Sequence, residues 1–369
     1  MRLLRVVHRW IGLVLALVLG IVGASGSLLL LKGPYYRWAH PALARPIAPD
    51  AAERYPAVLE SIDVTFAGAP VTLVKFPQPG MNAFQVWLAD GREALLDPAS
   101  GAVITEWRWW SSVPGFLFEL HAHLLAEGTG TVINGVAALG GLFLALSGVI
   151  VWWPRRNGAF RLRGAWPREL SAASLLRSHA ATGTLVALPL ALFLATGAAI
   201  VFYDEIETVM QATLDNQPVE RVSAVLPPRD EPRRSWTALL PVLRSTLPEG
   251  QLVFFYPGTP ANAAWTFRKR MPGEWHPNGR SYVLLDPYAG EVLQAIDARR
   301  QGLGTRVMYA VYPVHAAMVG GVGLVLLAAI SGFALFWLAT TGVVSYARAW
   351  LARRTRAETR AAPARAAAR

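Results

Sequence analysis

The chain has 369 residues, of which 53% are hydrophobic and only 16% charged. A soluble domain of this size carries about a quarter charged residues, so the composition favours a membrane protein and excludes a disordered chain. The absence of cysteine excludes disulfides, iron–sulfur clusters, thiolate zinc sites and covalently attached c-type haem. The net charge of +11 would indicate nucleic acid only if the basic residues formed a patch on a soluble domain. Their distribution along the chain argues against this, and we expect no nucleic-acid partner.

Four apolar runs are long enough to span a bilayer, which requires about 20 residues. They cover residues 10–31, 132–153, 180–203 and 316–340. The first run has a basic start and small residues near its end, as a secretory signal does. It resumes with leucines at 28–31, however, and we expect an uncleaved spanning helix.

Arginines gather in three segments and predict the topology, because cytoplasmic loops carry an excess of basic residues. These segments are the N-terminus (Arg2, Arg5, Arg9), the second loop (Arg155, Arg156, Arg161, Arg163, Arg168, Arg177) and the tail (Arg348, Arg353, Arg354, Arg356, Arg360, Arg365, Arg369). Four crossings place all three on one side. We therefore expect cytoplasmic termini and two extracytoplasmic segments in a multi-pass membrane protein.

The predicted domains follow from these crossings. The spanning regions are 1–32, 114–154, 177–204 and 307–346. Between and beyond them lie an extracytoplasmic domain at 33–113, a cytoplasmic Arg-rich loop at 155–176, a second extracytoplasmic domain at 205–306 and a basic cytoplasmic tail at 347–369.

The two extracytoplasmic segments resemble each other. Residues 95–103 match residues 284–292, and each contains Asp-Pro-x-x-Gly between apolar runs, which is typical of a hairpin turn. Two further strands are predicted upstream in each segment (71–76 and 83–89; 251–256 and 263–270), after a helix (51–61; 235–245). Each segment is thus predicted to be a small α+β domain.

The membrane runs also repeat. Residues 3–8 parallel 175–179, and residues 146–149 parallel 330–333. The predicted fold class is therefore a four-helix membrane bundle, built by tandem duplication, with two small α+β extracytoplasmic domains. The repeat would be parallel, related by an axis along the membrane normal.

The repeat also sorts the seven histidines. His8 and His179 occupy equivalent positions at the cytoplasmic entry of runs one and three. His121, or its neighbour His123, is equivalent to His315 at the extracytoplasmic approach to runs two and four. His40 and His276 lie in polar loops and have no counterparts.

Two pairs of histidines, each pair at one depth, suit low-spin b-type haem, whose iron takes two axial imidazoles. Packed helices lie about 8–10 Å apart, so a haem ring requires a locally opened seam. We expect glycines to provide it: Gly12, Gly20, Gly23, Gly26, Gly135, Gly140 and Gly141.

Two other interpretations of these histidines stay open. A lone histidine at a helix end is usually an interfacial residue. The pair His121 and His123 also has the H-x-H spacing of a zinc site, but on a helix the two side chains point in different directions and no nearby acid completes a tetrahedral set.

At this point the sequence resembles a known family. Residues 8–13 (His-Arg-Trp-Ile-Gly-Leu) resemble the opening of the PepSY-associated transmembrane helix family. Residues 120–125 (Leu-His-Ala-His-Leu-Leu), and later 152–155 (Trp-Trp-Pro-Arg), are similar to its second helix. Residues 178–183 resemble its third helix and His315 with Gly320 and Gly323 its fourth, so the resemblance covers about residues 2–345.

The resemblance implies a bacterial inner-membrane protein with two PepSY-like domains, often linked to iron uptake. Some members resemble di-haem reductases that release iron from ferric siderophores. Carried over by position, the axial ligands would be His8, His179, His121 and His315, with His123 as the alternative to His121. This sequence has Ala122 and Ala180 where arginine usually follows the histidine, which leaves Arg9 and Arg177 for the haem propionates.

Three functions compete at this stage. The first is an electron-transfer protein with two haem b groups, with quinol or a soluble reductase as its electron donor and a periplasmic ferric chelate as its acceptor. The second is a membrane-anchored PepSY binding or inhibitory module that performs no reaction. The third is a permease, for which the apolar runs offer few polar residues.

The tryptophans and the phenylalanine ahead of His121 have two interpretations. One is a docking site for the acceptor, and the other, which we favour, is an interfacial aromatic belt. They are Trp107, Trp109, Trp110 and Phe116.

Overall fold

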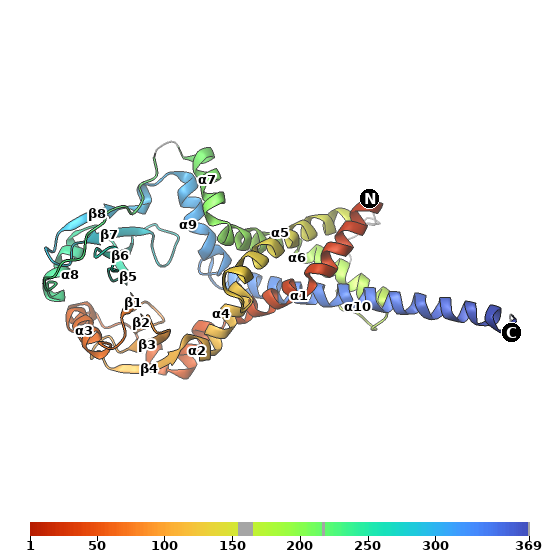
Figure 1. Cartoon of the computed structure of the whole chain (residues 1–369), viewed down its shortest axis with the longest axis horizontal. Helices are drawn as coiled ribbons and strands as arrows, with labels where there is room; N and C mark the ends of the chain where they lie inside the picture. The colour runs from red at the N-terminus through yellow and green to blue at the C-terminus, as the bar shows by residue number, and fades with distance from the viewer. Residues whose placement is uncertain (154–164, 216–217, 368–369) are drawn as a thin grey trace. The chain divides into compact units, whose positions relative to one another are not determined.

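The computed structural model describes residues 1–153, 165–215 and 218–367. Four of the loop arginines, Arg155, Arg156, Arg161 and Arg163, and the terminal Arg369 therefore lie outside the described residues. The chain forms two compact units (Figure 1). The helical unit comprises residues 1–30, 117–202 and 322–369, and the sheet unit comprises residues 31–116 and 203–321.

In the described part of the chain, four helices are long and apolar enough to cross a membrane, as the sequence predicts. They are α1 (Arg2–Leu29), α5 (Glu127–Trp152), α6 (Ala172–Val201) and the segment 321–359 of α10 (Gly321–Ala367). Helix α5 packs against both α1 and α6. A cluster around Leu19, Val186, Leu190, Leu194 and Leu335 forms the apolar core of this unit.

The second and fourth predicted spans, 114–154 and 307–346, are each divided into two helices. Helix α4 (Val113–His123) ends before α5 begins, and α9 (Leu303–His315) ends before α10 begins. Positive φ angles at Leu124 (50°) and Leu125 (59°) interrupt the first pair, and Ala317 (49°) and Gly320 (73°) interrupt the second. These angles are incompatible with a right-handed helix. The fourth span therefore begins at Gly321 instead of residue 316.

The sheet unit contains one antiparallel sheet of eight strands in the order β4-β3-β2-β1-β5-β6-β7-β8. The strands are β1 (Val71–Lys75), β2 (Phe84–Leu88), β3 (Arg92–Leu96), β4 (Val103–Arg108), β5 (Gln251–Tyr256), β6 (Trp265–Arg270), β7 (Ser281–Leu285) and β8 (Val292–Ile296). Strand β1 pairs with β5, so the two predicted α+β domains join edge to edge in one sheet. The sequence predicts the strands of each half but not this shared edge.

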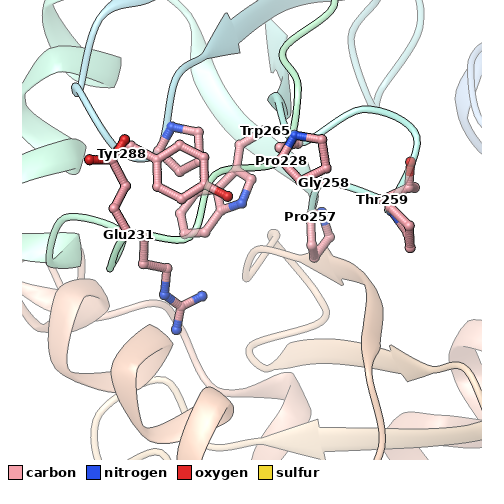
Figure 2. Close-up of a pocket in the computed structure, with 11 residues that line it drawn as sticks. Pro228, Glu231, Pro257, Gly258, Thr259, Trp265 and Tyr288 are labelled. Atoms are coloured by element: carbon pink, nitrogen blue, oxygen red, sulfur yellow. The ribbon is translucent and has the colours of Figure 1, made fainter.

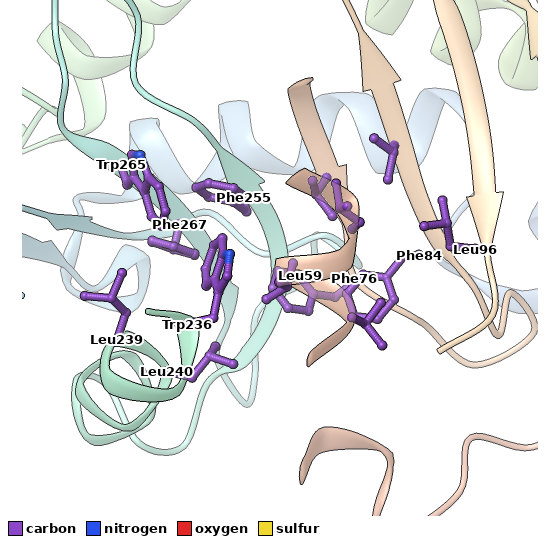
Figure 3. Packing of buried hydrophobic residues seen from close by; sticks show 14 of the residues in the cluster. Leu59, Phe76, Phe84, Leu96, Trp236, Leu239, Leu240, Phe255, Trp265 and Phe267 are labelled. Atoms are coloured by element: carbon purple, nitrogen blue, oxygen red, sulfur yellow. The ribbon is translucent and has the colours of Figure 1, made fainter. Parts of the chain in front are cut away.

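One face of the sheet is covered by the two predicted helices, α3 (Ala51–Thr65) and α8 (Trp236–Ser245). Figure 3 shows Leu59 of α3 beside Phe76 and Phe84, and Trp236 of α8 beside Phe255 and Phe267. The core residues of β2, β3, β6 and β7 are spaced two apart, as Phe84, Val86 and Leu88 are on β2, because successive side chains point to opposite faces of a sheet. The residues toward α3 and α8 are therefore apolar, and they form the main core of the unit.

The predicted Asp-Pro-x-x-Gly hairpin turns are confirmed. Oδ1 of Asp97 accepts hydrogen bonds from the backbone N–H of Ala99 and Ser100, at 3.0 and 2.9 Å. Oδ1 of Asp286 accepts the equivalent two bonds, at 2.7 and 3.0 Å. Gly101 and Gly290 have φ angles of 72° and 75°, which glycine adopts without strain.

Further short helices were not predicted from the sequence. In the first half of the sheet unit they are α2 (Lys32–Ala39), η1 (Pro41–Ala44) and η2 (Trp109–Ser111). In the second half they are α7 (Tyr203–Leu214) and η5 (Ala298–Arg300). Tyr36 of α2 and Leu43 of η1 pack on Leu95, so this segment covers part of the sheet face opposite α3 and α8.

Candidate functional site

The helical unit brings together His8 of α1 and His179 of α6. Their ring centres lie 6.4 Å apart and the ring planes are nearly perpendicular, at 89°. A nitrogen of an imidazole binds a transition metal at about 2 Å, so two imidazoles on opposite sides of one metal have ring centres about 6 Å apart. The separation therefore fits two axial ligands. Aromatic rings that merely pack edge to face have similar separations, so the distance alone does not distinguish packing from metal binding. The hydrogen bonds of the two rings do.

Both rings are held through Nδ1 by the next spanning helix in the chain, α5 for His8 and α10 for His179. Nδ1 of His8 lies 2.8 Å from Oγ of Ser147 on α5. Nδ1 of His179 lies 3.0 Å from the carbonyl oxygen of Leu338 on α10 and 3.4 Å from Oγ1 of Thr341. Metal-binding histidines almost always make such a bond with the ring nitrogen that does not bind the metal.

These contacts assign the tautomer of both rings. A carbonyl oxygen only accepts, so His179 carries its proton on Nδ1. The hydroxyl of Ser147 donates to the carbonyl of Leu144 at 3.3 Å, so its oxygen is an acceptor toward His8. Nε2 of each neutral ring then keeps its lone pair, and no hydrogen bond of a described residue involves either Nε2 atom. The donor set thus fits an iron porphyrin held by two neutral imidazoles.

Each of the two histidines also lies close to a glycine of the spanning helix that holds it. A Cβ on Gly148, the residue after Ser147, would lie 3.4 Å from Cε1 of His8. A Cβ on Gly342, the residue after Thr341, would lie 3.5 Å from Cε1 of His179. The pairs Ser147-Gly148 and Thr341-Gly342 therefore make matching contacts with the two histidines, whereas the sequence predicts residues 331 and 332 as the counterparts of 147 and 148.

The pair predicted from the sequence has a different role. Oγ of Ser331 donates within its own helix to the carbonyl of Leu327, at 2.7 Å. A Cβ on Gly332 would lie 2.5 Å from the carbonyl oxygen of Gly23, so this glycine allows α10 to approach α1. A hydroxyl residue followed by glycine occurs at both places on α10, as Ser-Gly at 331–332 and Thr-Gly at 341–342, and only the contacts distinguish them.

His121, on α4, contacts the first helix. Its Nδ1 lies 3.0 Å from the carbonyl oxygen of Val22. A Cβ on Gly26 would lie 2.7 Å from Cε1 of His121, closer than real Cβ atoms come, so only glycine admits the ring here. Nδ2 of Asn134 donates to the carbonyl oxygen of His121 at 2.6 Å and fixes the end of α4. His121 thus repeats the Nδ1–carbonyl contact of His179.

His123 has different surroundings from His121. Its Nδ1 lies 2.7 Å from Oγ1 of Thr131, its ring centre is 5.8 Å from that of Phe118, and its Nε2 is 4.0 Å from a carboxylate oxygen of Glu119. All three partners are within ten residues of His123 in the chain. Of the two histidines, His121 therefore contacts another spanning helix, and the choice between them as a ligand stays a prediction.

The remaining histidines belong to the sheet unit. His315 is half-buried at the C-terminal end of α9. Its pairing with His121, which lies in the helical unit, stays a prediction. His276 is buried among polar groups, where its Nε2 is 3.3 Å from Nη2 of Arg268, and His40 follows α2.

The two arginines expected to meet propionates lie at the same end of the helical unit as the first histidine pair. Cζ of Arg9 is 5.6 Å from the ring centre of Trp10 and 5.8 Å from that of Tyr346, a cation–π arrangement. Arg177 is exposed on α6, two residues before His179. A role for either arginine toward propionates is still a prediction.

The expectation that glycines open a seam is not met at most of the predicted positions. A Cβ on Gly20 would touch Ala339 at 3.5 Å, one on Gly135 would be 2.5 Å from Val201, and one on Gly141 would be 3.0 Å from Leu194. Gly12, Gly23 and Gly140 are likewise close to neighbouring helices. These glycines serve close helix packing. Gly26 differs, because its neighbour is His121.

Other candidate sites do not include the predicted ligands. Among the residues that the structure describes, no group of three or more His, Asp or Glu side chains is placed to hold a metal ion. A haem iron needs only two protein ligands, so this criterion does not address it. The sheet unit has an open groove of about 410 Å³ beside Trp265 and Tyr288, rich in proline and without histidine (Figure 2).

The chain belongs to the family described as PepSY-associated TM region, whose model matches residues 5–349. No curated protein matches the chain in sequence. Together with four apolar helices, the family identifies a membrane protein.

The residues that orient the histidines were not predicted from the sequence. Ser147, Thr341 and the carbonyl of Leu338 come from helices far along the chain. A signal was present: residues 144–148 (Leu-Ala-Leu-Ser-Gly) align with 338–342 (Leu-Ala-Thr-Thr-Gly) at the spacing that relates His121 to His315.

Proposed function

We propose that this protein is a di-haem b electron-transfer protein of the bacterial inner membrane, moving electrons from the cytoplasmic side to a periplasmic acceptor. The observation that carries the proposal is the pairing of His8 with His179, both fixed through Nδ1 by neighbouring helices. Two imidazoles that only packed against each other would not both need an unprotonated Nε2. Two imidazoles that bind the same haem iron would both need it.

Each haem, when bound, supplies a one-electron redox centre, and the protein positions it and sets its potential. Here that role falls to groups on four helices. Ser147 and Leu338 hold the two rings and raise the basicity of Nε2, since a proton shared through Nδ1 leaves more electron density on the ligating nitrogen. The half-buried positions of His8 and His179 restrict water at the site.

The second haem is assigned to His121 and His315 by the duplication that we infer. Three features of the described residues support the duplication. The sheet has two halves of four strands, the two hairpin turns have the same hydrogen bonds, and both His8 and His179 meet a Ser/Thr-Gly pair on the following spanning helix. In this arrangement the sheet unit is extracytoplasmic, and the arginine-rich ends are cytoplasmic.

The electron donor is on the cytoplasmic side and is quinol or a soluble reductase. The acceptor is a ferric chelate, with ferric siderophores as the proposed substrates in iron uptake. Reduction releases the metal because ferrous iron is a poorer match than ferric iron for hard oxygen ligands. The activity is therefore that of a ferric-chelate reductase.

The test is a dithionite-reduced minus oxidised absorbance spectrum of the full chain, purified from cells supplied with ample haem. We expect the paired α and β bands of low-spin b-type haem. Their absence would contradict the proposal and favour the alternative, a membrane-anchored PepSY module that binds or inhibits a partner. In that case, replacement of His8 by Ala would leave the function unchanged.

A further inference from the structure

Helix α2 begins directly after the first spanning helix. Helix α1 ends at Leu29, and α2 begins at Lys32 with Pro34 in its first turn. A proline has no N–H and its ring clashes with the carbonyl four residues earlier, so α1 cannot continue through Pro34. As a helix, the apolar run 10–31 is about 33 Å long, close to the ~30 Å of hydrocarbon in a bilayer. Helix α2 therefore begins where the chain leaves the hydrocarbon.

The two sides of α2 differ in burial. Tyr36 is buried and packs with Leu95 in the sheet unit. Leu31, Tyr35 and Trp38 follow one another at intervals of four and three residues, which places them together on another side of the helix. All three are exposed, and the rings of Tyr35 and Trp38 lie 6.3 Å apart. Helix α2 thus packs one side on the sheet unit and leaves an aromatic side exposed.

A second exposed strip lies at the other crossing between the two units. The chain enters the sheet unit at residue 31 and returns to the helical unit at residue 117. Trp110, Val113 and Phe116 precede this return at intervals of three residues, and all three are exposed. Nζ of Lys32 lies 5.1 Å from the ring centre of Trp109, so α2 and η2 are neighbours. We call the residues of both strips the aromatic face: Leu31, Tyr35, Trp38, Trp110, Val113 and Phe116.

Burial selects which aromatic residues near His121 belong to this face. Trp107 stacks on Tyr36 with ring centres 5.5 Å apart, and both Trp107 and Trp109 are half-buried. Of the four residues for which the sequence suggests an aromatic belt or a docking site, only Trp110 and Phe116 are exposed. The other two help to hold α2 in place and are not free to form an outer surface.

The charged residues of α2 are all basic. Its sequence, Lys-Gly-Pro-Tyr-Tyr-Arg-Trp-Ala, contains no acidic residue, and Arg37 is exposed on a different side from Trp38. Tryptophan and tyrosine are enriched at the headgroup level of membranes, and long basic side chains reach from an apolar surface to the phosphates. A short helix of this composition at the end of a span suits the boundary between lipid and water.

We propose that the aromatic face lies in the membrane interface, with α2 as an interfacial helix. Its occupant is phospholipid, with Leu31 toward the acyl chains and Tyr35 and Trp38 at the level of the headgroups. The observation that carries this proposal is that both strips adjoin the points where the chain enters and leaves the helical unit, whose helices span the membrane. The first half of the sheet unit is thereby held at the membrane surface. No part of the proposal requires a haem.

The test uses the absence of cysteine in the chain, since one introduced cysteine can then be labelled alone. The full chain with Trp38→Cys carries a nitroxide and is placed in phosphatidylcholine nanodiscs, whose two faces both meet the solvent. Electron paramagnetic resonance measures how often the label collides with oxygen, which concentrates in lipid, and with a nickel chelate, which stays in water. The matched control is Val64→Cys on α3, because Val64 and Trp38 are equally exposed, at 79% each.

We expect the ratio of oxygen to nickel collisions to be several-fold higher at position 38 than at position 64. Trp110→Cys should also give a high ratio, which repeats the test on the second strip if the replacement of Trp38 disturbs α2. Arg37→Cys, on another side of the same helix, should give a lower ratio than Trp38→Cys.

Two results would overturn the proposal. Labels at positions 38 and 110 that collide with the nickel chelate as often as the label at 64 would show that the aromatic face lies in water. Labels shielded from both reagents would show that protein covers this face, either a second copy of the chain or another partner.

Discussion

His8 and His179 face each other across the helical unit with ring centres 6.4 Å apart, and each ring is fixed through Nδ1 by a different helix. Helix α5 holds the ring on α1, and α10 holds the ring on α6. Four spanning helices thus determine the positions of two side chains. This arrangement makes the orienting residues testable separately from the ligands themselves.

The first prediction concerns the hydroxyl of Ser147. Ser147→Ala removes the acceptor at Nδ1 of His8 but leaves the imidazole in place. Loss of such a partner typically costs about 10–100-fold in metal affinity, so we expect haem at this site to dissociate about tenfold faster or more. Transfer of haem to apomyoglobin, followed by absorbance, measures the rate.

Ser331→Ala is the matched control for Ser147→Ala. Ser331 is also a buried serine of a spanning helix, but its hydroxyl bonds only within α10. Its replacement should leave the rate of haem loss unchanged. If the two variants behave alike, the assignment of Ser147 as the residue that orients His8 is wrong.

A second prediction uses the glycine beside His121. A Cβ at Gly26 would lie 2.7 Å from Cε1 of the ring, so Gly26→Ala should displace His121. We expect this variant to bind one haem per chain instead of two. The control is Gly323→Ala on α10, where an added Cβ meets no atom within 4 Å. Retention of two haems by Gly26→Ala would show that His121 is not an axial ligand.

A third prediction concerns Glu93 and stability. Burial raises the pKa of Glu93 from 4.5 to about 7, against the opposing charges of Lys32 and Lys75. The folded protein therefore holds this proton more tightly than the unfolded chain does. The protonated Glu93 side chain therefore contributes to the free energy of unfolding in full below pH 4.5, and this contribution is lost as the pH rises toward 7.

Glu93→Gln should remove this loss. A shift of this size corresponds to at most about 3 kcal/mol, so the variant should gain up to that amount over the wild type between pH 4.5 and pH 8. Unfolding in detergent, followed by tryptophan fluorescence at both pH values, gives the difference. Glu106→Gln, on the edge strand β4, is the control and should show no comparable gain. A Glu93→Gln profile parallel to that of the wild type contradicts the prediction.

Local patterns in the sequence predict most of the elements. The apolar runs place α1, α5, α6 and α10, since a span of this length needs no tertiary information. The repeated Asp-Pro-x-x-Gly places the hairpins at Asp97 and Asp286, because the aspartate accepts bonds from its own turn. Both features depend on residues near one another in the chain.

Features that depend on distant residues were not predictable in the same way. The pairing of Lys75 with Phe254 joins the two halves in one sheet, and nothing local in β1 or β5 specifies that partner. The breaks before α5 and α10 involve Leu124 and Ala317, residue types that rarely adopt positive φ. The partner of His179 was missed because the fourth run contains both Ser331-Gly332 and Thr341-Gly342, and only the contact shows which of the two pairs meets the ring.

The most direct test of the central claim is the haem-to-protein ratio of the full chain, measured by pyridine haemochrome for the wild type, His8→Ala and His179→Ala. We predict two haems per chain in the wild type and one in each variant, because either replacement removes a ligand of the same haem. A ratio that is unchanged in both variants, or a wild-type protein without haem despite an ample supply, would contradict it.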